Sequence, residues 1–359
     1  MLTASCILLT DQPCASADVS GGGLVCAVYG FDPKSAFFRG RPPAQAARTL
    51  SSWGVNAVFG GYQDPEVRKA LRGHGIRIFA ELGCFVGERY WRERPESRPV
   101  NDVGQRIAKV KWYAGVCPSQ GWLRADIVKR ARKLVSRYEL DGVWLDFIRY
   151  PGHWEAPRPH LEQTCFCAAC LRRFLKETGI ETPEGLPVRE KAHWILANKK
   201  DEWTRFKTGS IAGLVREVRR AVTAAKPGTM VGFFAVPWSR DERHGAVLEI
   251  LGQDHRLLGG WADAVSPMTY HVLIARPASW ISSAVSQISR DAGKPVWPVV
   301  FVGDQEHPLT AEGLKAAVEA ALAPPSGGVI LFSLGELERA GRLGEVAPLF
   351  ETCRRRSGP

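Results

Sequence analysis

The feature that most constrains the fold is an alternation of apolar runs of strand length with helical patterns. The apolar runs cover residues 24–30, 55–60, 76–81, 141–147, 230–236, 262–270, 296–302 and 327–333. Several are continuously apolar, which is typical of strands buried on both faces of a parallel sheet. Eight such strands separated by helices predict an α/β fold, a (β/α)₈ TIM barrel in a single domain.

The helical patterns between these runs carry start and stop signals. Pro42-Pro43 opens the first helix, Asp64 is the predicted N-cap of a helix that Gly73 closes, and Thr310 is the predicted N-cap of another. The remaining helical patterns lie at 127–138, 199–225, 245–251, 279–291 and 336–350. A doubly wound open sheet is the alternative, but it requires a glycine-rich phosphate loop after the first strand, and residues 29–32 do not form one.

The chain divides into three parts. Residues 1–20 are interpreted as a leader or a disordered N-terminus, 21–353 as the barrel, and 354–359 as a basic tail. Long insertions follow the third strand, at about 82–120, and the fourth strand. The apolar run at 7–10 is too short for a signal peptide and no basic residue precedes it, so an exported and a cytoplasmic location both stay open. No apolar run reaches the length of a membrane span.

The net charge of +11 favours acidic partners, namely nucleic acid, anionic lipid or an acidic glycan. The basic residues are dispersed, however, and the one dense run is Arg354-Arg355-Arg356. Since the chain shows no RNA-binding signature, we expect no nucleic-acid partner. The 12 Trp and 15 Phe residues are ample for a large core, and many Trp residues also suit a cleft that stacks sugars.

Active sites of TIM barrels lie at the C-terminal ends of the strands. The polar and aromatic residues at these ends are Tyr29, Glu81, Asp146, Arg149, Trp238, Arg240, Asp241, Tyr270, His271, Asp304, Glu306 and Glu336. Carboxylates and aromatic rings dominate, and no Ser-His-Asp set stands out. Paired carboxylates between aromatic walls are what glycoside hydrolysis requires, because one acid protonates the leaving oxygen while a second carboxylate attacks or activates water.

Asp146 is the first candidate for a catalytic carboxylate because it ends the fourth strand. An Asp146–Arg149 ion pair that only shapes a loop is the alternative. We expect Glu81 to be its catalytic partner, with Asp304 and Glu306 as the other candidates. The predicted substrate-binding residues are Tyr29, Arg149, Trp238, Tyr270 and His271. Arg149 would also set the ionisation of Asp146 through the proximity of its charge.

The stretch 141–151, with sequence DGVWLDFIRYP, resembles the fourth-strand motif of glycoside-hydrolase-like TIM-barrel proteins. It is also distantly similar to the corresponding motif of family 18 chitinases, and residues 267–271 look like the sixth-strand motif of the same broad group. That resemblance implies a tyrosine facing substrate at Tyr270. The chitinase motif places its acidic Glu where this chain has Ile148, so chitinase activity is not implied.

Three of the nine cysteines, Cys165, Cys167 and Cys170, lie within six residues and predict a metal site. A disulfide pair and reduced thiols are the alternatives. The cluster resembles that of family 42 β-galactosidases, in which a C-x-C-x₂-C run and one earlier cysteine hold a structural zinc. The resemblance implies Cys117 as the fourth ligand, with Cys84 as the fallback. A closed Cys₄ zinc is structural, and no organic cofactor is expected.

The leading hypothesis is therefore a glycoside hydrolase that cleaves an oligo- or polysaccharide, with an acidic glycan favoured by the basic charge. A non-catalytic glycan-binding barrel is the second hypothesis, because the chitinase acid is missing at Ile148. A basic protein that engages nucleic acid is the third, and it predicts DNA binding with a steep salt dependence.

Overall fold

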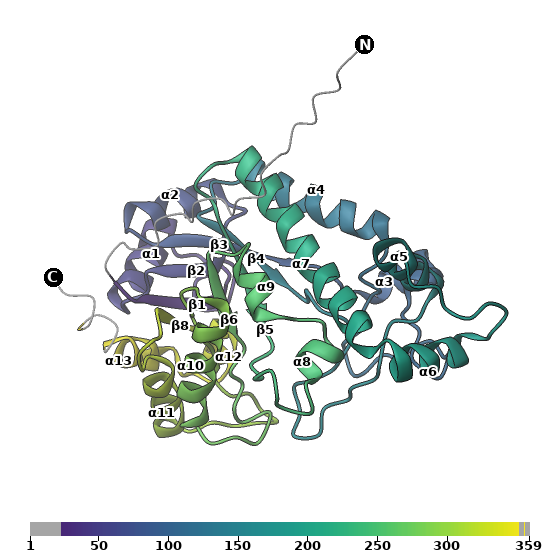
Figure 1. The fold of residues 1–359 in the computed structure, drawn as a ribbon. Coiled ribbons are helices and arrows are strands. Elements are labelled where there is room, and N and C mark those ends of the chain that lie inside the picture. The colour runs from purple at the N-terminus through teal and green to yellow at the C-terminus, as the bar shows by residue number, and fades with distance from the viewer. Residues whose placement is uncertain (1–22, 352–354, 356–359) are drawn as a thin grey trace, which may run out of the picture.

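The computed structural model describes residues 23–351 and Arg355, and its centre is an eight-stranded parallel sheet. The strands are β1 (Val25–Phe31), β2 (Ala57–Gly60), β3 (Arg77–Gly83), β4 (Gly142–Asp146), β5 (Met230–Ala235), β6 (Ala264–Pro267), β7 (Val299–Phe301) and β8 (Gly328–Phe332). Their order is β6-β5-β4-β3-β2-β1-β8-β7, and isolated parallel bridges join Val265 to Val296 and Met268 to Val299. Because these bridges bring the two edges of the sheet together, the predicted (β/α)₈ barrel is confirmed (Figure 1).

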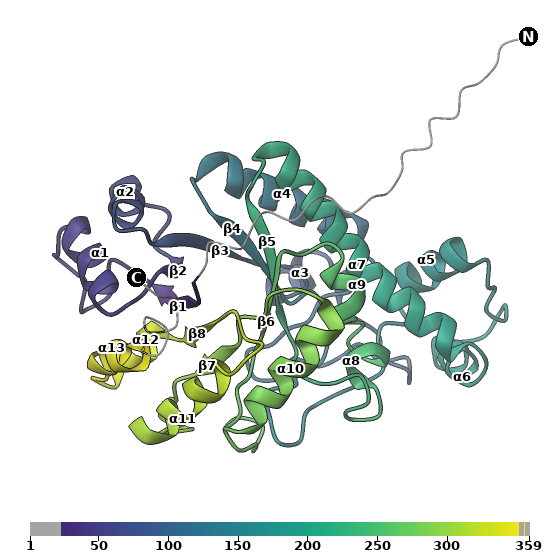
Figure 2. The same ribbon diagram turned by 60° about the vertical axis from the view of Figure 1, so that its left-hand side comes forward.

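Helices surround the strands (Figure 2). The longer ones are α1 (Pro43–Ser52), α2 (Pro65–Gly73), α4 (Gly121–Arg137), α7 (Lys200–Ala225), α10 (Trp280–Ala292) and α11 (Ala311–Ala321). The shorter ones are α8 (Ala246–Glu249), α9 (His255–Gly259), α12 (Leu334–Arg339), η2 (Leu343–Glu345) and α13 (Val346–Leu349). The predicted N-caps are confirmed, since Asp64 accepts a hydrogen bond from the backbone N–H of Glu66 at 2.9 Å and Thr310 accepts one from Gly313 at 3.0 Å.

Long insertions follow β3 and β4, as the sequence predicts. The insertion after β3 contains α3 (Glu88–Glu93) and η1 (Pro95–Ser97), and the one after β4 contains α5 (Ala168–Thr178) and α6 (Val188–Asn198). They contact each other through a bridge between Asn101 and Thr164 and through a 2.9 Å hydrogen bond from Phe166 N–H to Val100 O. The two insertions therefore form one layer next to the ends of β3 and β4.

The interior of the barrel is filled by large aromatic rings. Trp144 stacks on Trp297 with ring centroids 5.0 Å apart and an interplanar angle of 14°. Phe79 contacts both indoles, at 4.8 and 5.8 Å. Gly232 on β5 faces Trp144 and leaves room for its ring. This packed layer closes the barrel below the strand ends, as in other barrels of this type.

Two strands are shorter than the apolar runs that predict them. The run 262–270 yields β6, which ends at Pro267, and the run 296–302 yields β7, which begins after Pro298. Proline has no backbone N–H to donate to a sheet, so the regular strand is interrupted at each proline. Hydrogen bonds continue beyond both, from Met268 N–H to Ala235 O and from Trp297 N–H to Val265 O, each at 2.9 Å. The expected leader at 1–20 lies outside the described residues, as does the expected basic tail apart from Arg355. Within the described ranges, no helix is both long and apolar enough to cross a membrane.

Replacing Gly232 by alanine tests the packing of the barrel interior. A methyl group at position 232 would meet the Trp144 ring closer than van der Waals contact allows. We expect Gly232→Ala to lower the free energy of unfolding by about 1–3 kcal/mol. Urea denaturation measures this change. Gly209→Ala is the control, because that position on α7 is open, and it should stabilise the helix by about 0.5–1 kcal/mol.

Candidate active site

Two carboxyl side chains meet at the end of the barrel because β3 and β4 pair in register. Glu81 is the register partner of Trp144, and Gly83 is the partner of Asp146. Successive side chains of a strand alternate between its faces, so Glu81 shares the inner face with Phe79, and Asp146 shares it with Trp144. Both carboxyls therefore point toward the barrel axis at the C-terminal ends of neighbouring strands.

Glu81 is half-buried and held by a tyrosine. The Tyr29 hydroxyl, at the end of β1, donates a hydrogen bond to Glu81 Oε2. Burial, and then the negative charge of Asp146, raises the pKa of Glu81 to about 8. The carboxyl of Glu81 consequently carries a proton at neutral pH.

Asp146 is more acidic than its neighbour. Burial raises the pKa of Asp146 to about 6, while the charge of Arg149 and a hydrogen bond from the Phe147 backbone N–H to Oδ1 at 2.6 Å lower it. Phe147 has φ 53°, a left-handed conformation that is rare for a bulky residue and that occurs at functional sites. At neutral pH Asp146 is mostly ionised while Glu81 is protonated, so the pair supplies a base and an acid side by side.

Arg149 is a buried cation that acts on the carboxyls from a distance. Its side chain is held against two aromatic rings, with the guanidinium carbon 5.0 Å from the Phe147 centroid and 5.6 Å from that of Tyr113. Among the described residues it has no ion pair, and its Nε and Nη1 atoms are buried without a hydrogen-bond partner. Its charge lowers the pKa of Asp146 and also that of Glu155.

Glu155 is a third carboxyl at this site that the sequence patterns did not indicate. Burial raises its pKa to about 7, the charge of Arg149 lowers it, and the charge of Asp146 raises it. No hydrogen bond or ion pair ties Glu155 to another residue in the described part of the chain. It follows Trp154, whose ring stacks on Tyr270 with centroids 5.7 Å apart. Its place in the loop after the fourth-strand motif was the one available signal.

The other predicted substrate-binding residues differ in position. Tyr270 is buried, and its ring stacks on Phe332 with centroids 5.3 Å apart. Burial raises the pKa of its hydroxyl, and the charges of Glu155, Asp146 and Glu81 raise that pKa further. Tyr270 therefore belongs to the carboxyl site. Trp238 is 1% exposed, lies edge-on to Trp154 at 6.4 Å, and is covered by Arg243 at 5.0 Å.

His271 is also buried, and burial lowers the pKa of its imidazole. Its Nδ1 atom is enclosed without a partner among the described residues. The structure thus places His271 and Trp238 within the protein interior.

Asp304 and Glu306 lie away from Asp146. Both line a hollow of about 600 Å³ between the loop after β7 and α12, together with Glu336 and Arg342. Asp304 accepts a 2.6 Å hydrogen bond from the His307 backbone N–H and so stabilises its own loop. Neither carboxylate is among the charges that shift the pKa of Asp146 or Glu81. Glu81 is thus the candidate partner that the structure brings next to Asp146.

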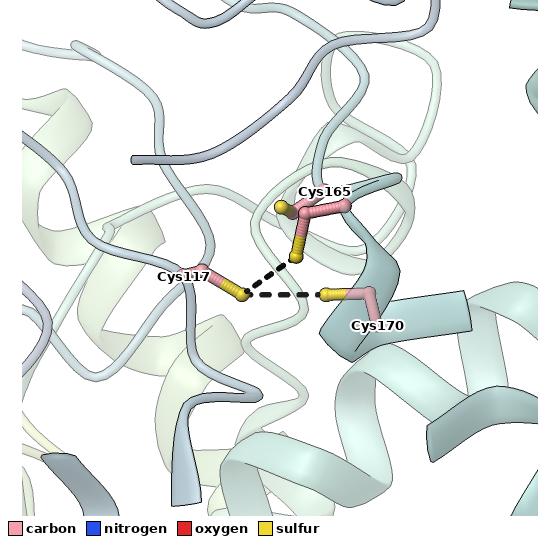
Figure 3. Close-up of side chains that lie close together, drawn as sticks. Cys117, Cys165 and Cys170 are labelled. Carbon is pink, nitrogen blue, oxygen red and sulfur yellow. Dashed lines mark hydrogen bonds between the residues drawn. The ribbon is translucent and has the colours of Figure 1, made fainter. Parts of the chain in front are cut away.

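A second cluster consists of Cys117, Cys165, Cys167 and Cys170, whose four buried sulfur atoms lie within 4.8 Å of one another. Cys117 Sγ is 3.4 Å from Cys170 Sγ (Figure 3). It is 3.5 Å from Cys167 Sγ. These cysteines and Cys84 are free thiols, whereas Cys26 is disulfide-bonded.

Cys84 does not belong to this cluster. It lies near the carboxyl site, where its thiol donates a hydrogen bond to Leu82 O at 3.3 Å. The negative charges of Asp146 and Glu81 contribute to the raised pKa of this thiol. Cys117 is therefore the cysteine that the structure places with the three clustered ones, as the resemblance implies.

The donor set of the cluster fits a tetrahedral metal such as zinc, which binds four cysteine sulfurs in closed structural sites. The surroundings also fit, because the Val100 backbone N–H donates to Cys165 Sγ at 3.3 Å and Ser119 Oγ lies 3.2 Å from Cys170 Sγ. Such contacts orient thiolate ligands. Cys117 comes from the insertion after β3 and the other three from the insertion after β4, so an ion here would join the two insertions.

Solved structures match this fold, although no protein-family model and no curated protein matches the sequence. The glycoside hydrolase domain of PgaB (BpsB) from Bordetella bronchiseptica has a TM-score of 0.65 at 13% identity, covering 91% of this chain and 98% of that domain. A β-galactosidase from Bacillus circulans sp. alkalophilus has a TM-score of 0.65 at 14% identity, covering 93% of this chain and 56% of that one. A GH42 β-galactosidase from G. stearothermophilus has a TM-score of 0.61 at 12% identity, covering 93% of this chain and 57% of that one.

These similarities show that the chain has the TIM-barrel fold found in several glycoside hydrolases. At such low identity they establish the fold alone, because one fold hosts many activities. The chain spans just over half of each β-galactosidase. The cysteine cluster predicted from the family 42 resemblance is present, whereas these neighbours do not bear on the family 18 resemblance.

The raised pKa of Glu81 predicts a dependence of stability on pH. Between its ordinary pKa of 4.5 and about 8, the folded protein binds a proton that the unfolded chain releases, so stability is highest at the acidic end and falls as pH rises through this window. We expect the free energy of unfolding to fall from pH 5 to 8, and to fall less in Glu81→Gln. Urea denaturation across this range measures it. The exposed Glu312→Gln variant should follow wild type, and a pH dependence of Glu81→Gln equal to wild type would contradict the assignment.

Proposed function

We propose that this protein is a glycoside hydrolase that cleaves an oligo- or polysaccharide at the C-terminal face of its barrel. The observation that carries the proposal is the adjacent pair of a protonated Glu81 and an ionised Asp146, two carboxyls held apart in pKa by their surroundings. This is the arrangement that acid–base cleavage of a glycosidic bond needs. The occurrence of the same fold in glycoside hydrolases supports the proposal.

In the proposed reaction, Glu81 donates its proton to the leaving glycosidic oxygen as the bond to the anomeric carbon breaks. Asp146, ionised, attacks that carbon or removes a proton from the water that attacks it. Tyr29 fixes the carboxyl of Glu81 through its hydrogen bond, and Arg149 keeps Asp146 ionised. The charges of both carboxyls raise the pKa of the Tyr270 hydroxyl. This hydroxyl is proposed to contact the sugar hydroxyls.

The buried residues His271 and Trp238 are proposed to support the substrate-binding site from the protein interior. Because both are enclosed, neither is proposed to contact the sugar directly. Trp238 would act through its neighbours, since it packs against Trp154 and Trp154 stacks on Tyr270. An acidic glycan remains the substrate class favoured by the net charge of +11.

A glycan-binding barrel without turnover is the second candidate. The observation that favours it is Ile148, which is buried where the chitinase motif carries its acid. In that case sugars bind to the site and no glycosidic bond is cleaved, so binding without release of reducing ends would distinguish the two functions.

We further propose that Cys117, Cys165, Cys167 and Cys170 hold a structural zinc. The four sulfur atoms are buried and mutually close, as a closed Cys₄ site requires. The site lies apart from the carboxyl pair, so the ion would act on the geometry of the insertions rather than on the substrate.

Release of new reducing ends from a broad polysaccharide panel tests the hydrolase proposal. We expect wild type to release them from at least one substrate and Asp146→Asn to be slower by about a thousandfold or more, because its amide can neither attack nor act as a base. Asp304→Asn is the matched control and should keep wild-type activity. Full activity of Asp146→Asn would remove Asp146 from the mechanism.

The metal content of purified protein tests the zinc proposal. We expect one zinc ion per chain in wild type, and loss of this zinc with a lower thermal midpoint in Cys170→Ser, because structural zinc binding contributes directly to folding stability. Cys84→Ser serves as the control and should retain zinc, since Cys84 lies outside the cluster. Metal-free wild type, or full zinc content in Cys170→Ser, would contradict the proposal.

A further inference from the structure

Trp112 is an exposed indole at the tip of a tight hairpin in the insertion after β3. It is 55% exposed, and no other tryptophan among the described residues is as exposed. Val110 and Tyr113 exchange backbone hydrogen bonds of 3.1 and 2.8 Å, so Lys111 and Trp112 form a two-residue turn. Lys111 has φ 52°, a left-handed conformation of the kind such turns require.

The hairpin tip lies against the residue that follows Asp146. The Trp112 ring is 5.8 Å from Phe147 and 5.8 Å from Tyr113, at steep angles of 75° and 84°. Phe147 in turn stacks on Tyr113 at 5.9 Å. These edge contacts orient the indole while much of its surface remains in solvent, and they tie it to the end of β4.

The charge of Lys111 at the tip also acts on the third carboxyl of the site. The positive charge of Lys111 lowers the pKa of Glu155 and that of His153, both in the loop after β4. Trp112 therefore lies near Asp146 through its contact with Phe147, and the neighbouring Lys111 lies within electrostatic reach of Glu155.

Exposing an indole in this way leaves a large hydrophobic surface in water. Burial of a large apolar side chain stabilises a protein, and this fold buries Trp144, Trp154, Trp238 and Trp297. A single exposed apolar residue is ordinary on a protein surface. Trp112 differs because aromatic neighbours orient it and because it borders the candidate catalytic carboxyls.

We propose that Trp112 is the platform of a sugar-binding subsite next to the Asp146–Glu81 pair, on which a pyranose ring stacks through its C–H face. This inference rests on the proposed function and narrows its substrate: the ligand is a glycan of at least two sugar units, one at the carboxyls and one on Trp112. Lys111 reaches the hydroxyl or acidic groups of the second sugar.

Binding to a catalytically silent protein tests the subsite. Asp146→Asn is titrated with soluble hexasaccharides of neutral sugars (β-1,4-linked glucose, N-acetylglucosamine, galactose and xylose) and of acidic sugars (α-1,4-linked galacturonic acid and β-1,4-linked mannuronic acid). Tryptophan fluorescence and calorimetry follow the binding. We expect at least one hexasaccharide to bind, and its Kd to rise about tenfold when Trp112→Ala is added, as the loss of an aromatic stacking surface implies.

Matched variants separate stacking from folding. Trp112→Phe keeps an aromatic face and should retain most of the affinity. Leu257→Ala removes another exposed apolar side chain, on α9, and should leave the affinity unchanged. In wild type, Trp112→Ala should raise the KM for the oligosaccharide while leaving that for an aryl monosaccharide unchanged.

Two results would overturn the subsite: a Kd unaffected by Trp112→Ala, or no binding of any hexasaccharide at millimolar concentration. The proposed function fails separately. If binding depends on Trp112 but wild type hydrolyses no substrate, the subsite is supported and the hydrolase proposal is rejected. If wild type hydrolyses a substrate and Trp112→Ala changes neither its binding nor its KM, the hydrolase proposal is supported and the subsite is rejected.

Discussion

The in-register pairing of β3 with β4 is the constraint on which the candidate site depends. It places Glu81 and Asp146 on the same inner face of neighbouring strands. A slip of one residue would turn one of them outward, because side chains alternate along a strand. The Trp144–Trp297 stack closes the barrel beneath the pair. Burial, which removes water from the two carboxyls, is the largest cause of their raised pKa values. The charge of Arg149 lowers the pKa of Asp146 and so widens the difference between the two pKa values.

The two insertions and the cysteine cluster form one system with this site. The insertion after β3 carries Trp112, and the insertion after β4 carries Glu155. The cluster joins the same two insertions, through Cys117 on one side and Cys170 on the other. A metal ion at the cluster would therefore hold the loops that border the carboxyls. A structural ion that does not touch the substrate would still act on how substrate is positioned.

Much of the fold could be predicted from local patterns. Continuous apolar runs mark the strands, and the caps at Asp64 and Thr310 follow from their own neighbours in sequence. The cysteine cluster was visible because its ligands are close in sequence. Glu155 and Trp112 were not visible, since they lie on irregular loops whose position depends on tertiary contacts. Burial of Trp238 could not be predicted either, because a strand-end position does not reveal which neighbours cover it.

A crystal structure of Asp146→Asn with a bound oligosaccharide would test the central claim most directly. The account predicts a sugar ring at the end of β4, with its glycosidic oxygen within hydrogen-bond distance of the Glu81 carboxyl and its anomeric carbon facing the side chain at position 146. A sugar bound elsewhere, for example in the hollow lined by Asp304 and Glu306, would contradict it and move the chemistry away from the Glu81–Asp146 pair.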